Sequence, residues 1–263
     1  MSIKIALLGK HGIEKIIRKI KEHELEIDFE RPDIALAYGG DGTVLYAARK
    51  YSEIPLLGVR SLDSLGFLTN IDEEYFDKAL ERIKKGDYSI KEETKIEATS
   101  YLLKYNKVVR LEALNEIQIR TKFPTRASKD FVMVNGNYIF VDEKEKHPSP
   151  IISDGIVVST PCGSTGYFAS LIKAQDDLNF RSNLMWRKKL FEEGIGIAIN
   201  NPHLRQKNYE IVPEDSKILL LHVAADCYLA CDNDEKNIYE VIGGDRILIR
   251  KSPNKAKFIY FKD

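Results

Sequence analysis

A short apolar run, DIALAY over residues 33–38, leads directly into the loop GGDGT over residues 39–43, and an Ala-rich run follows over residues 44–51. The first run is typical of a buried parallel strand and the last of a helix. Because parallel α/β sheets bind ligands beyond the carboxyl ends of their strands, this loop lies where a ligand site is expected. The sequence therefore predicts an α/β domain with a Gly-rich loop at the edge of its sheet.

The same alternation extends to both sides of the loop. Residues 3–8 and 54–59 are further apolar runs, and residues 13–20 and 73–85 repeat apolar side chains at helical spacing. Strands that alternate with helices favour a parallel sheet covered by helices. We therefore predict a Rossmann-like α/β domain over residues 1–91.

A different pattern begins near residue 90, where short runs rich in β-branched and aromatic residues replace the helices. Asn135-Gly136 between two of these runs is a strong hairpin signal. We predict a larger all-β domain, a β-sandwich, over residues 92–250, with one helix over about 167–173. Residues 251–263 form a C-terminal tail that can return to the N-terminal domain.

Charge and cysteine content exclude several classes of partner. The 263-residue chain has 40 Lys plus Arg and 40 Asp plus Glu, so its formal net charge is zero, whereas a nucleic-acid or membrane-surface partner would require a basic excess. No run reaches the roughly 18 apolar residues that a membrane span needs. Three cysteines are too few for a disulfide framework. We expect a cytoplasmic protein without nucleic-acid or membrane partners.

The GGDGT loop has the composition of a phosphate site. Its glycines let the backbone approach phosphate oxygens, and the helix that follows presents free N–H groups. A carboxylate inside such a loop repels phosphate, so Asp41 makes sense as a metal holder or as a base that accepts a hydroxyl proton. The alternative is a Gly-rich turn in which Asp41 caps the helix.

Two further groups of polar residues suit a nucleoside. Asp154-Gly155 precedes a strand and then the turn TPCGSTGY over residues 160–167, whose hydroxyls and amides can bond a polar ligand while Tyr167 offers a ring for stacking. Asn115-Glu116 opens another strand with an amide and a carboxylate suited to a ribose diol. The alternatives are a well-capped helix start at Ser164 or Thr165 and an ordinary strand edge.

Together these motifs resemble the NAD kinases in identity, order and spacing. The resemblance covers nearly the whole chain: GGDGT, SLGFLT over residues 64–69, LNE over residues 114–116, and the DG step that leads into STPCGSTGY. GGDGT alone is shared with diacylglycerol, sphingoid and phosphofructokinases, whereas the DG and STPCGSTGY block is far more specific.

The resemblance implies that Asp41 lies beside the 2′-hydroxyl of the adenosine ribose as the base or metal-assisting group. It implies a phosphate loop made of Gly39, Gly40, Gly42 and Thr43. It implies that NAD is bound by Gly42, Phe67, Asn115, Glu116, Asp154, Cys162, Thr165, Gly166, Tyr167 and Asp232. It also implies Mg²⁺ or another divalent cation brought with the nucleotide, ATP or polyphosphate as the phosphoryl donor, and a homodimer or homotetramer.

The chain departs from the family pattern at several places. Asp63 and Ile152 replace a common Gly and Arg, Asn233 follows Asp232 where Gly is usual, and residues 173–183 lack the usual Ala-Gly-Gly-Pro. Two alternatives to an NAD kinase therefore stay open. One is a lipid or sphingoid kinase that shares the GGDGT loop, and the other is a catalytically silent NAD(P) sensor.

Overall fold

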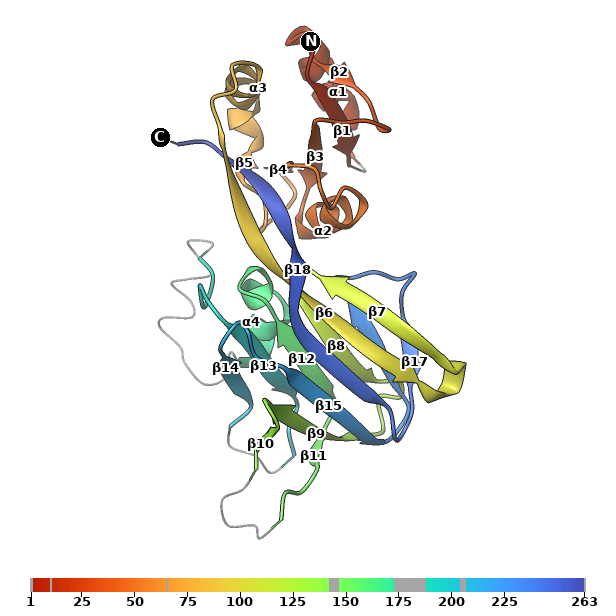
Figure 1. Ribbon diagram of the computed structural model, residues 1–263. Helices are drawn as coiled ribbons and strands as arrows, with labels where there is room; N and C mark the ends of the chain where they lie inside the picture. Colours follow the sequence, from red (N-terminus) through yellow and green to blue (C-terminus); the bar gives the residue numbers. More distant parts are fainter. Residues whose placement is uncertain are drawn as a thin grey trace. The chain divides into compact units, whose positions relative to one another are not determined.

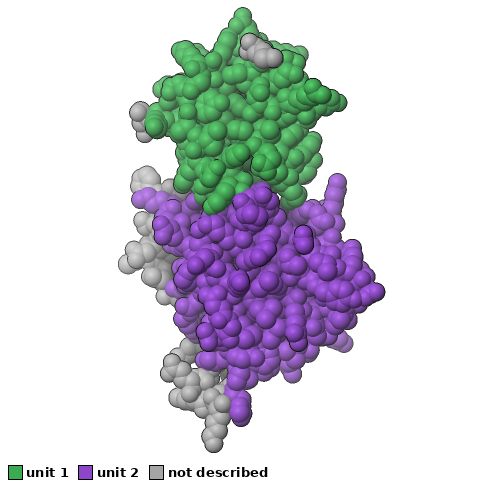
Figure 2. Space-filling model, viewed as in Figure 1, with its two compact units in different colours: residues 1–93, 255–263 green, residues 94–254 purple. Residues whose placement is uncertain are grey.

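The computed structural model describes residues 2–9, 11–64, 66–141, 147–172, 188–203 and 207–262. The chain forms two compact units, one of Met1–Glu93 with Lys255–Asp263 and the other of Thr94–Asn254 (Figures 1 and 2). Residues 173–183, which differ from the family pattern, lie outside the described residues.

The first unit contains a parallel sheet built from apolar strands. Its strands follow the order β2 (Glu26–Ile27), β1 (Lys4–Leu8), β3 (Ile34–Gly39), β4 (Leu56–Arg60), and β5 (Ile71–Asp72) pairs with β4. The C-terminal end of β18 (Arg246–Tyr260) adds a further parallel pairing, between Phe258 and Leu56.

The helices of the first unit are amphipathic, as the spacing of their apolar residues predicts. They are α1 (Ile13–Glu22), α2 (Asp41–Lys50) and α3 (Phe76–Lys84), the last preceded by the short turn η1 (Glu73–Tyr75). Helix α1 buries Ile16 and Ile20, and α3 buries Phe76, Leu80 and Ile83. These side chains form one core with the sheet, and each fully buried aliphatic side chain contributes roughly 1.5–3 kcal/mol.

The second unit consists of two antiparallel sheets and few helical turns. One sheet has the order β14 (Tyr209–Val212), β13 (Ile195–Asn200), β12 (Gly155–Ser159), β8 (Glu116–Thr121), β16 (Cys227–Cys231), β17 (Tyr239–Val241). The other contains β10 (Asn137–Ile139), β9 (Ser128–Val134), β15 (Ile218–Ala224), β18, β6 (Ser89–Leu102) and β7 (Lys107–Ala113), with β11 (Ile151–Ser153) on β9. The described part of this unit contains the helical elements η2 (Leu103–Tyr105), η3 (Cys162–Thr165) and α4 (Tyr167–Ile172).

One apolar core joins the two sheets of this unit. Ile117 and Ile156 come from one sheet, Ile96 and Ile247 from the other, and all four are fully buried in the same cluster. Side chains alternate between the core and the outer face along each strand. The predicted fold class, an α/β unit followed by a β-rich unit, is confirmed.

The long strands differ from the sequence expectation. The sequence predicts that the β-rich domain ends at residue 250 and that a tail follows, but β18 continues through Pro253 to Tyr260. Proline normally interrupts a strand because it lacks an N–H, and the pattern of side chains alone does not reveal that tertiary pairing carries the strand onward.

Candidate active site

The GGDGT loop connects the carboxyl end of β3 to the first residue of α2. Gly39 has φ +151°, and a Cβ on it would lie 2.6 Å from Thr43 Oγ1. A Cβ on Gly40 would lie 2.3 Å from Ser64 Oγ. By contrast, a Cβ on Gly42 would meet no heavy atom within 4 Å. The loop therefore packs tightly on one side and leaves the N-terminal end of α2 accessible at Gly42, as an anion site requires.

Asp41 links this loop to the segment of residues 64–69. Its Oδ1 atom accepts a hydrogen bond from the amide of Leu68 at 2.7 Å. Phe67, the neighbour of Leu68, is half-buried. Two motifs that are separate in the sequence are thus brought together around one carboxylate, and the predicted residues Asp41 and Phe67 belong to the same unit.

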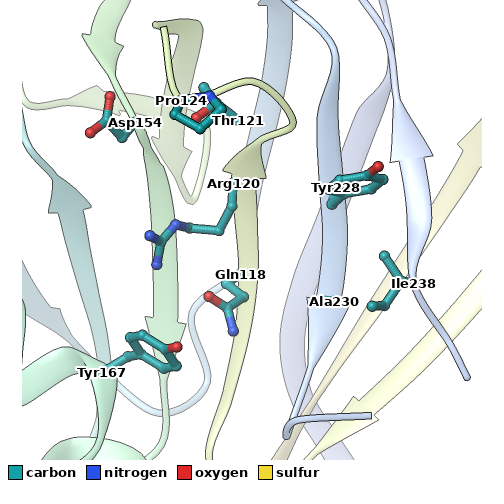
Figure 3. A pocket seen from close by; sticks show the side chains of 9 residues that line it. All are labelled: Gln118, Arg120, Thr121, Pro124, Asp154, Tyr167, Tyr228, Ala230 and Ile238. Atoms are coloured by element: carbon teal, nitrogen blue, oxygen red, sulfur yellow. The ribbon is translucent and has the colours of Figure 1, made fainter. Parts of the chain in front are cut away.

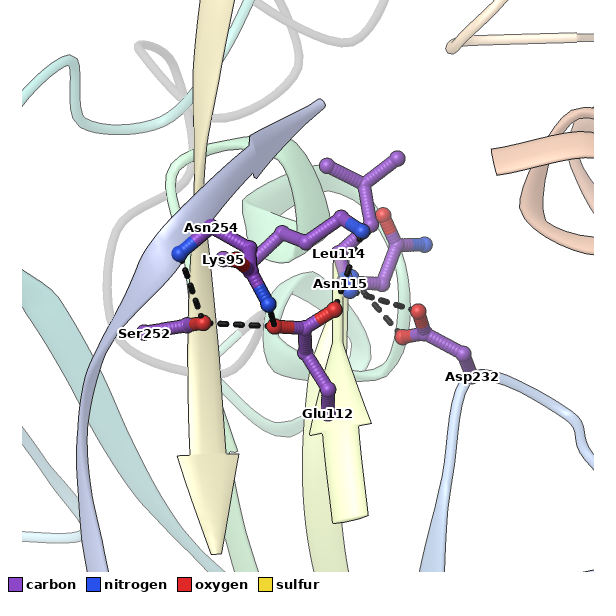
Figure 4. A network of polar contacts seen from close by, with 7 residues as sticks. All are labelled: Lys95, Glu112, Leu114, Asn115, Asp232, Ser252 and Asn254. Atoms are coloured by element: carbon purple, nitrogen blue, oxygen red, sulfur yellow. Dashed lines mark hydrogen bonds and ion pairs between the residues drawn. The ribbon is translucent and has the colours of Figure 1, made fainter. Parts of the chain in front are cut away.

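The Asn115-Glu116 step in the second unit is held by Asp232. The Asp232 carboxylate accepts hydrogen bonds from the amides of Leu114 at 2.5 Å and Asn115 at 2.8 Å (Figure 4). It also accepts one from the amide of Glu116 at 3.1 Å. Asp232 is itself buried. The structure therefore shows this carboxylate fixing the backbone of the step, and its contact with NAD stays a prediction.

The turn that contains Gly163 packs on the other side of the same step. The Thr160 amide donates to the Asn115 carbonyl at 2.9 Å, and a Cβ on Gly163 would lie 2.2 Å from that carbonyl oxygen. Cys162, in the same turn, is buried. No larger residue fits at Gly163 without a backbone shift, so the glycine is required by close packing.

Two buried polar atoms of this step lack a hydrogen-bond partner among the described residues: Asn115 Oδ1 and Glu116 Oε2. A Cβ on Gly166 would lie 3.5 Å from Glu116 Oε2 and 3.8 Å from Asn115 Nδ2, so both side chains lie next to Gly166, which is partly exposed. An unpaired buried polar atom costs about 1–3 kcal/mol, so the pair is a candidate site for ligand hydroxyls.

The electrostatics of Glu116 are unusual for a carboxylic acid. Its burial raises the pKa to about 8, and the negative charge of Asp232 acts in the same direction. A buried acid whose pKa is strongly raised, with a specific charged neighbour, is a candidate functional group.

A cavity of about 430 Å³ lies on the outer face of the six-stranded sheet (Figure 3). It is lined by Gln118, Arg120, Thr121, Pro124, Asp154, Tyr167, Tyr228, Ala230 and Ile238. Asp154 and Tyr167 were predicted from the sequence. Tyr167 is half-exposed, and the Asp154 carboxylate accepts a hydrogen bond from Asn201 Nδ2 at 3.1 Å.

Sequence reasoning missed the other lining residues, above all Arg120. The signal is present in β8, where Ile117 and Ile119 are buried and Gln118 and Arg120 alternate with them on the outer face. An arginine on that face, four residues after Glu116, is a candidate for an anionic ligand. Strand alternation applied to the motif would have identified it.

The described residues contain no group of three or more His, Cys, Asp and Glu arranged to hold a metal ion. Mg²⁺ is commonly held by one or two carboxylates together with substrate phosphates. Asp41 at an accessible helix start fits that donor set. Within the described part of the chain, no helix is long and apolar enough to cross a membrane.

The fold and the site define a nucleotide-binding protein with a Gly-rich loop between β3 and α2 and a polar pocket on a β-sheet. Residues 11–88 match the family model of the ATP-NAD kinase N-terminal domain. An NAD kinase of Caldanaerobacter subterraneus is 35% identical over 254 residues, which cover 96% of this chain and 80% of that protein. The chain belongs to the NAD kinase family.

Two solved structures share the fold. Yeast NADH kinase, crystallised with NADH, has a TM-score of 0.78 at 16% identity, with 99% of this chain and 84% of that chain covered. An NAD kinase from Archaeoglobus fulgidus, crystallised with ATP, has a TM-score of 0.72 at 21% identity, with 100% and 94% covered. At these identities the likeness concerns the fold alone.

Proposed function

We propose that this protein transfers a phosphoryl group from ATP to the 2′-hydroxyl of the adenosine ribose of NAD, which forms NADP. The observation that carries the proposal is the pair of unpartnered buried atoms, Asn115 Oδ1 and Glu116 Oε2, beside Gly166. A carboxylate and an amide so placed accept hydrogen bonds from adjacent ribose hydroxyls and recover the cost of their burial.

The adjoining cavity suits the rest of a dinucleotide. Tyr167 presents a half-exposed ring on which a base can stack. Gln118, Arg120 and Asp154 give the walls polar and charged character. A long acyl chain would leave these groups desolvated without partners, so the polar lining argues against a lipid or sphingoid acceptor.

In this proposal, the loop between β3 and α2 binds the phosphates and carries out the phosphoryl transfer. The open face at Gly42 and the positive end of α2 suit the charge of the transferring phosphoryl group. Asp41 accepts the proton that leaves the ribose 2′-hydroxyl while the oxygen forms its bond to the γ-phosphorus of ATP and the bond to ADP breaks. Mg²⁺, when bound with the nucleotide, neutralises charge on the phosphates.

The test is an assay of the purified chain with NAD, ATP and MgCl₂, coupled to a dehydrogenase that reduces NADP but not NAD. We expect NADPH to accumulate when NAD, ATP and Mg²⁺ are all present, and not when any one is omitted. Polyphosphate in place of ATP tests the second donor. Binding of NAD without turnover under all these conditions would indicate the silent sensor instead.

We also propose that the protein works in the cytoplasm as a homodimer or homotetramer, which rests on the family resemblance. Size-exclusion chromatography with light-scattering detection measures the mass of the protein in solution. A monomeric mass at assay concentration with full turnover would contradict the assembly.

A further inference from the structure

Arg120 is a cation in the cavity, and the proposed reaction assigns it no specific ligand. It lies on β8, is half-buried and points across the sheet face in the direction of Tyr167 (Figure 3). Its guanidinium carbon lies 5.7 Å from the centre of the Tyr167 ring. Among the described residues, no carboxylate forms an ion pair with it. The side chain is held by an aromatic ring and keeps its charge available to a ligand.

The strand fixes how far this cation lies from the ribose site. Arg120 follows Glu116 by four residues on β8, which is about 13 Å at the usual rise of a strand. The Arg120 side chain turns toward Tyr167 (Figure 3), and the backbone of Arg120 is paired with Gly155 on β12. The guanidinium therefore lies closer to the Glu116 end of the strand than its own backbone does.

The covalent structure of NAD places one anionic group within that reach. The pyrophosphate is joined to the adenosine ribose through a single methylene, whereas the nicotinamide lies beyond a second ribose. Guanidinium groups bond phosphate oxygens in pairs and are the preferred cations for this purpose. Neither Glu116 nor Asp154 is suited to bind a phosphate, because a carboxylate carries the same negative charge.

We propose that Arg120 is the positioning residue that binds the pyrophosphate of NAD, an inference that rests on the proposed function. Bound there, it orients the dinucleotide so that the ribose hydroxyls meet Asn115 and Glu116. It also selects acceptors that carry a pyrophosphate over the bare nucleoside.

The experiment compares three ligands by calorimetric titration: NAD, ADP-ribose, which keeps the pyrophosphate but lacks nicotinamide, and adenosine, which lacks both. Arg120→Ala is expected to weaken NAD and ADP-ribose equally, by roughly 10- to 100-fold, the range of a lost charge-assisted bond. Adenosine affinity is expected to stay the same. Arg120→Lys should recover part of the loss, because a point charge replaces the planar fork.

Arg110→Ala is the matched control, since Arg110 is an exposed arginine on β7 in the other sheet. It should change none of the three affinities. In the coupled assay, Arg120→Ala should raise the KM for NAD while kcat changes little, because the reacting atoms are untouched.

Three results would overturn the inference. Loss of NAD affinity with unchanged ADP-ribose affinity would place Arg120 at the nicotinamide. Equal loss for adenosine would show a structural role, and unchanged affinity for all three ligands would show a solvated side chain. Failure of the wild-type chain to bind NAD would instead remove the proposed function itself.

Discussion

The carboxylate of Asp41 accepts a hydrogen bond from the amide of Leu68 at 2.7 Å, which ties the start of α2 to the segment after β4. This bond uses Oδ1 of Asp41 and needs only an acceptor oxygen. An asparagine offers the same acceptor without the negative charge. The structural role of Asp41 can therefore be separated from a chemical one by a substitution that keeps the bond.

Gly42→Ala should separate stability from turnover in the same loop. A Cβ at this position meets no heavy atom within 4 Å, and the residue lies in the first turn of α2. Alanine favours a helix over glycine by up to about 1 kcal/mol, so the variant should be at least as stable as the wild type. We expect turnover to fall at least tenfold, because the methyl group occupies the surface on which the phosphate approaches.

Urea unfolding and the coupled assay measure the two effects of Gly42→Ala. Gly163→Ala is the contrasting variant. Its Cβ would lie 2.2 Å from the Asn115 carbonyl oxygen, so it should lose about 1–3 kcal/mol of stability. Wild-type turnover by Gly42→Ala would show that no phosphate approaches that surface.

The affinity for NAD should rise with pH because of Glu116. Burial and the neighbouring Asp232 raise the pKa of Glu116 to about 8, so the side chain is mostly protonated at pH 6. Ribose hydroxyls that donate to the carboxylate favour the ionised form, and binding below pH 8 must release a proton. We expect the Kd for NAD to fall up to tenfold per pH unit between pH 6 and 8 and then level off.

Calorimetric titration from pH 6 to 9 checks this dependence. Glu116→Gln should bind NAD more weakly, by roughly 10-fold or more above pH 8, and should lose the pH slope while ATP affinity changes less. Glu53→Gln, at an exposed carboxylate of the first unit, should keep the wild-type slope. An unchanged affinity for NAD in Glu116→Gln would remove Glu116 from the site.

A buried ion pair in the second unit gives a stability prediction. His222 Nδ1 lies 2.7 Å from Asp130 Oδ1 and His222 Nε2 lies 2.6 Å from the Ala225 carbonyl, so both ring nitrogens face acceptors. Burial is the largest influence on the pKa of His222 and opposes the charge on the ring. The hydrogen bonds to Asp130, Cys227 and the Ala225 carbonyl, together with the negative charge of Asp130, outweigh burial and raise the pKa of His222 to about 10.

Because the folded-state pKa of His222 exceeds its usual value of 6.5, the pair contributes its full stability below pH 6.5 and loses it as the pH rises toward 10. His222→Asn should cost about 3–5 kcal/mol at pH 6, since the buried Asp130 loses its cation, and should remove the decline between pH 7 and 10. His147→Asn, at an exposed histidine, should leave unfolding unchanged. A wild-type stability that stays flat from pH 7 to 10 would contradict the charged pair.

Local sequence patterns were sufficient for the fold class and for the motifs. Apolar runs and their spacing located β3 and α2 around the Gly-rich loop. They were insufficient for Arg120 and Tyr228, which meet in one cavity because β8 pairs with β16 in a register that places these two residues opposite each other. The register between two strands depends on tertiary packing, so it cannot be read from the sequence alone.

The role of Asp232 illustrates the same limit. The family resemblance predicts that Asp232 contacts NAD, and the structure shows in addition that its carboxylate accepts hydrogen bonds from the amides of residues 114–116. A side chain far away in the sequence thus positions the Asn115-Glu116 step. Sequence spacing gave no indication of that bond.

The turnover of Asp41→Asn with NAD, ATP and Mg²⁺, measured together with its affinity for NAD, tests directly whether Asp41 accepts the proton of the ribose 2′-hydroxyl. The variant keeps an acceptor for the Leu68 amide, and the N-cap of α2 is Gly40, so Asp41 is not the helix cap. Stability and NAD affinity should therefore stay near wild type. Loss of the proton-accepting oxygen should lower kcat by on the order of 10²–10⁴. Near-normal turnover would contradict the account, because it would show that Asp41 serves the fold and that the chemistry lies elsewhere.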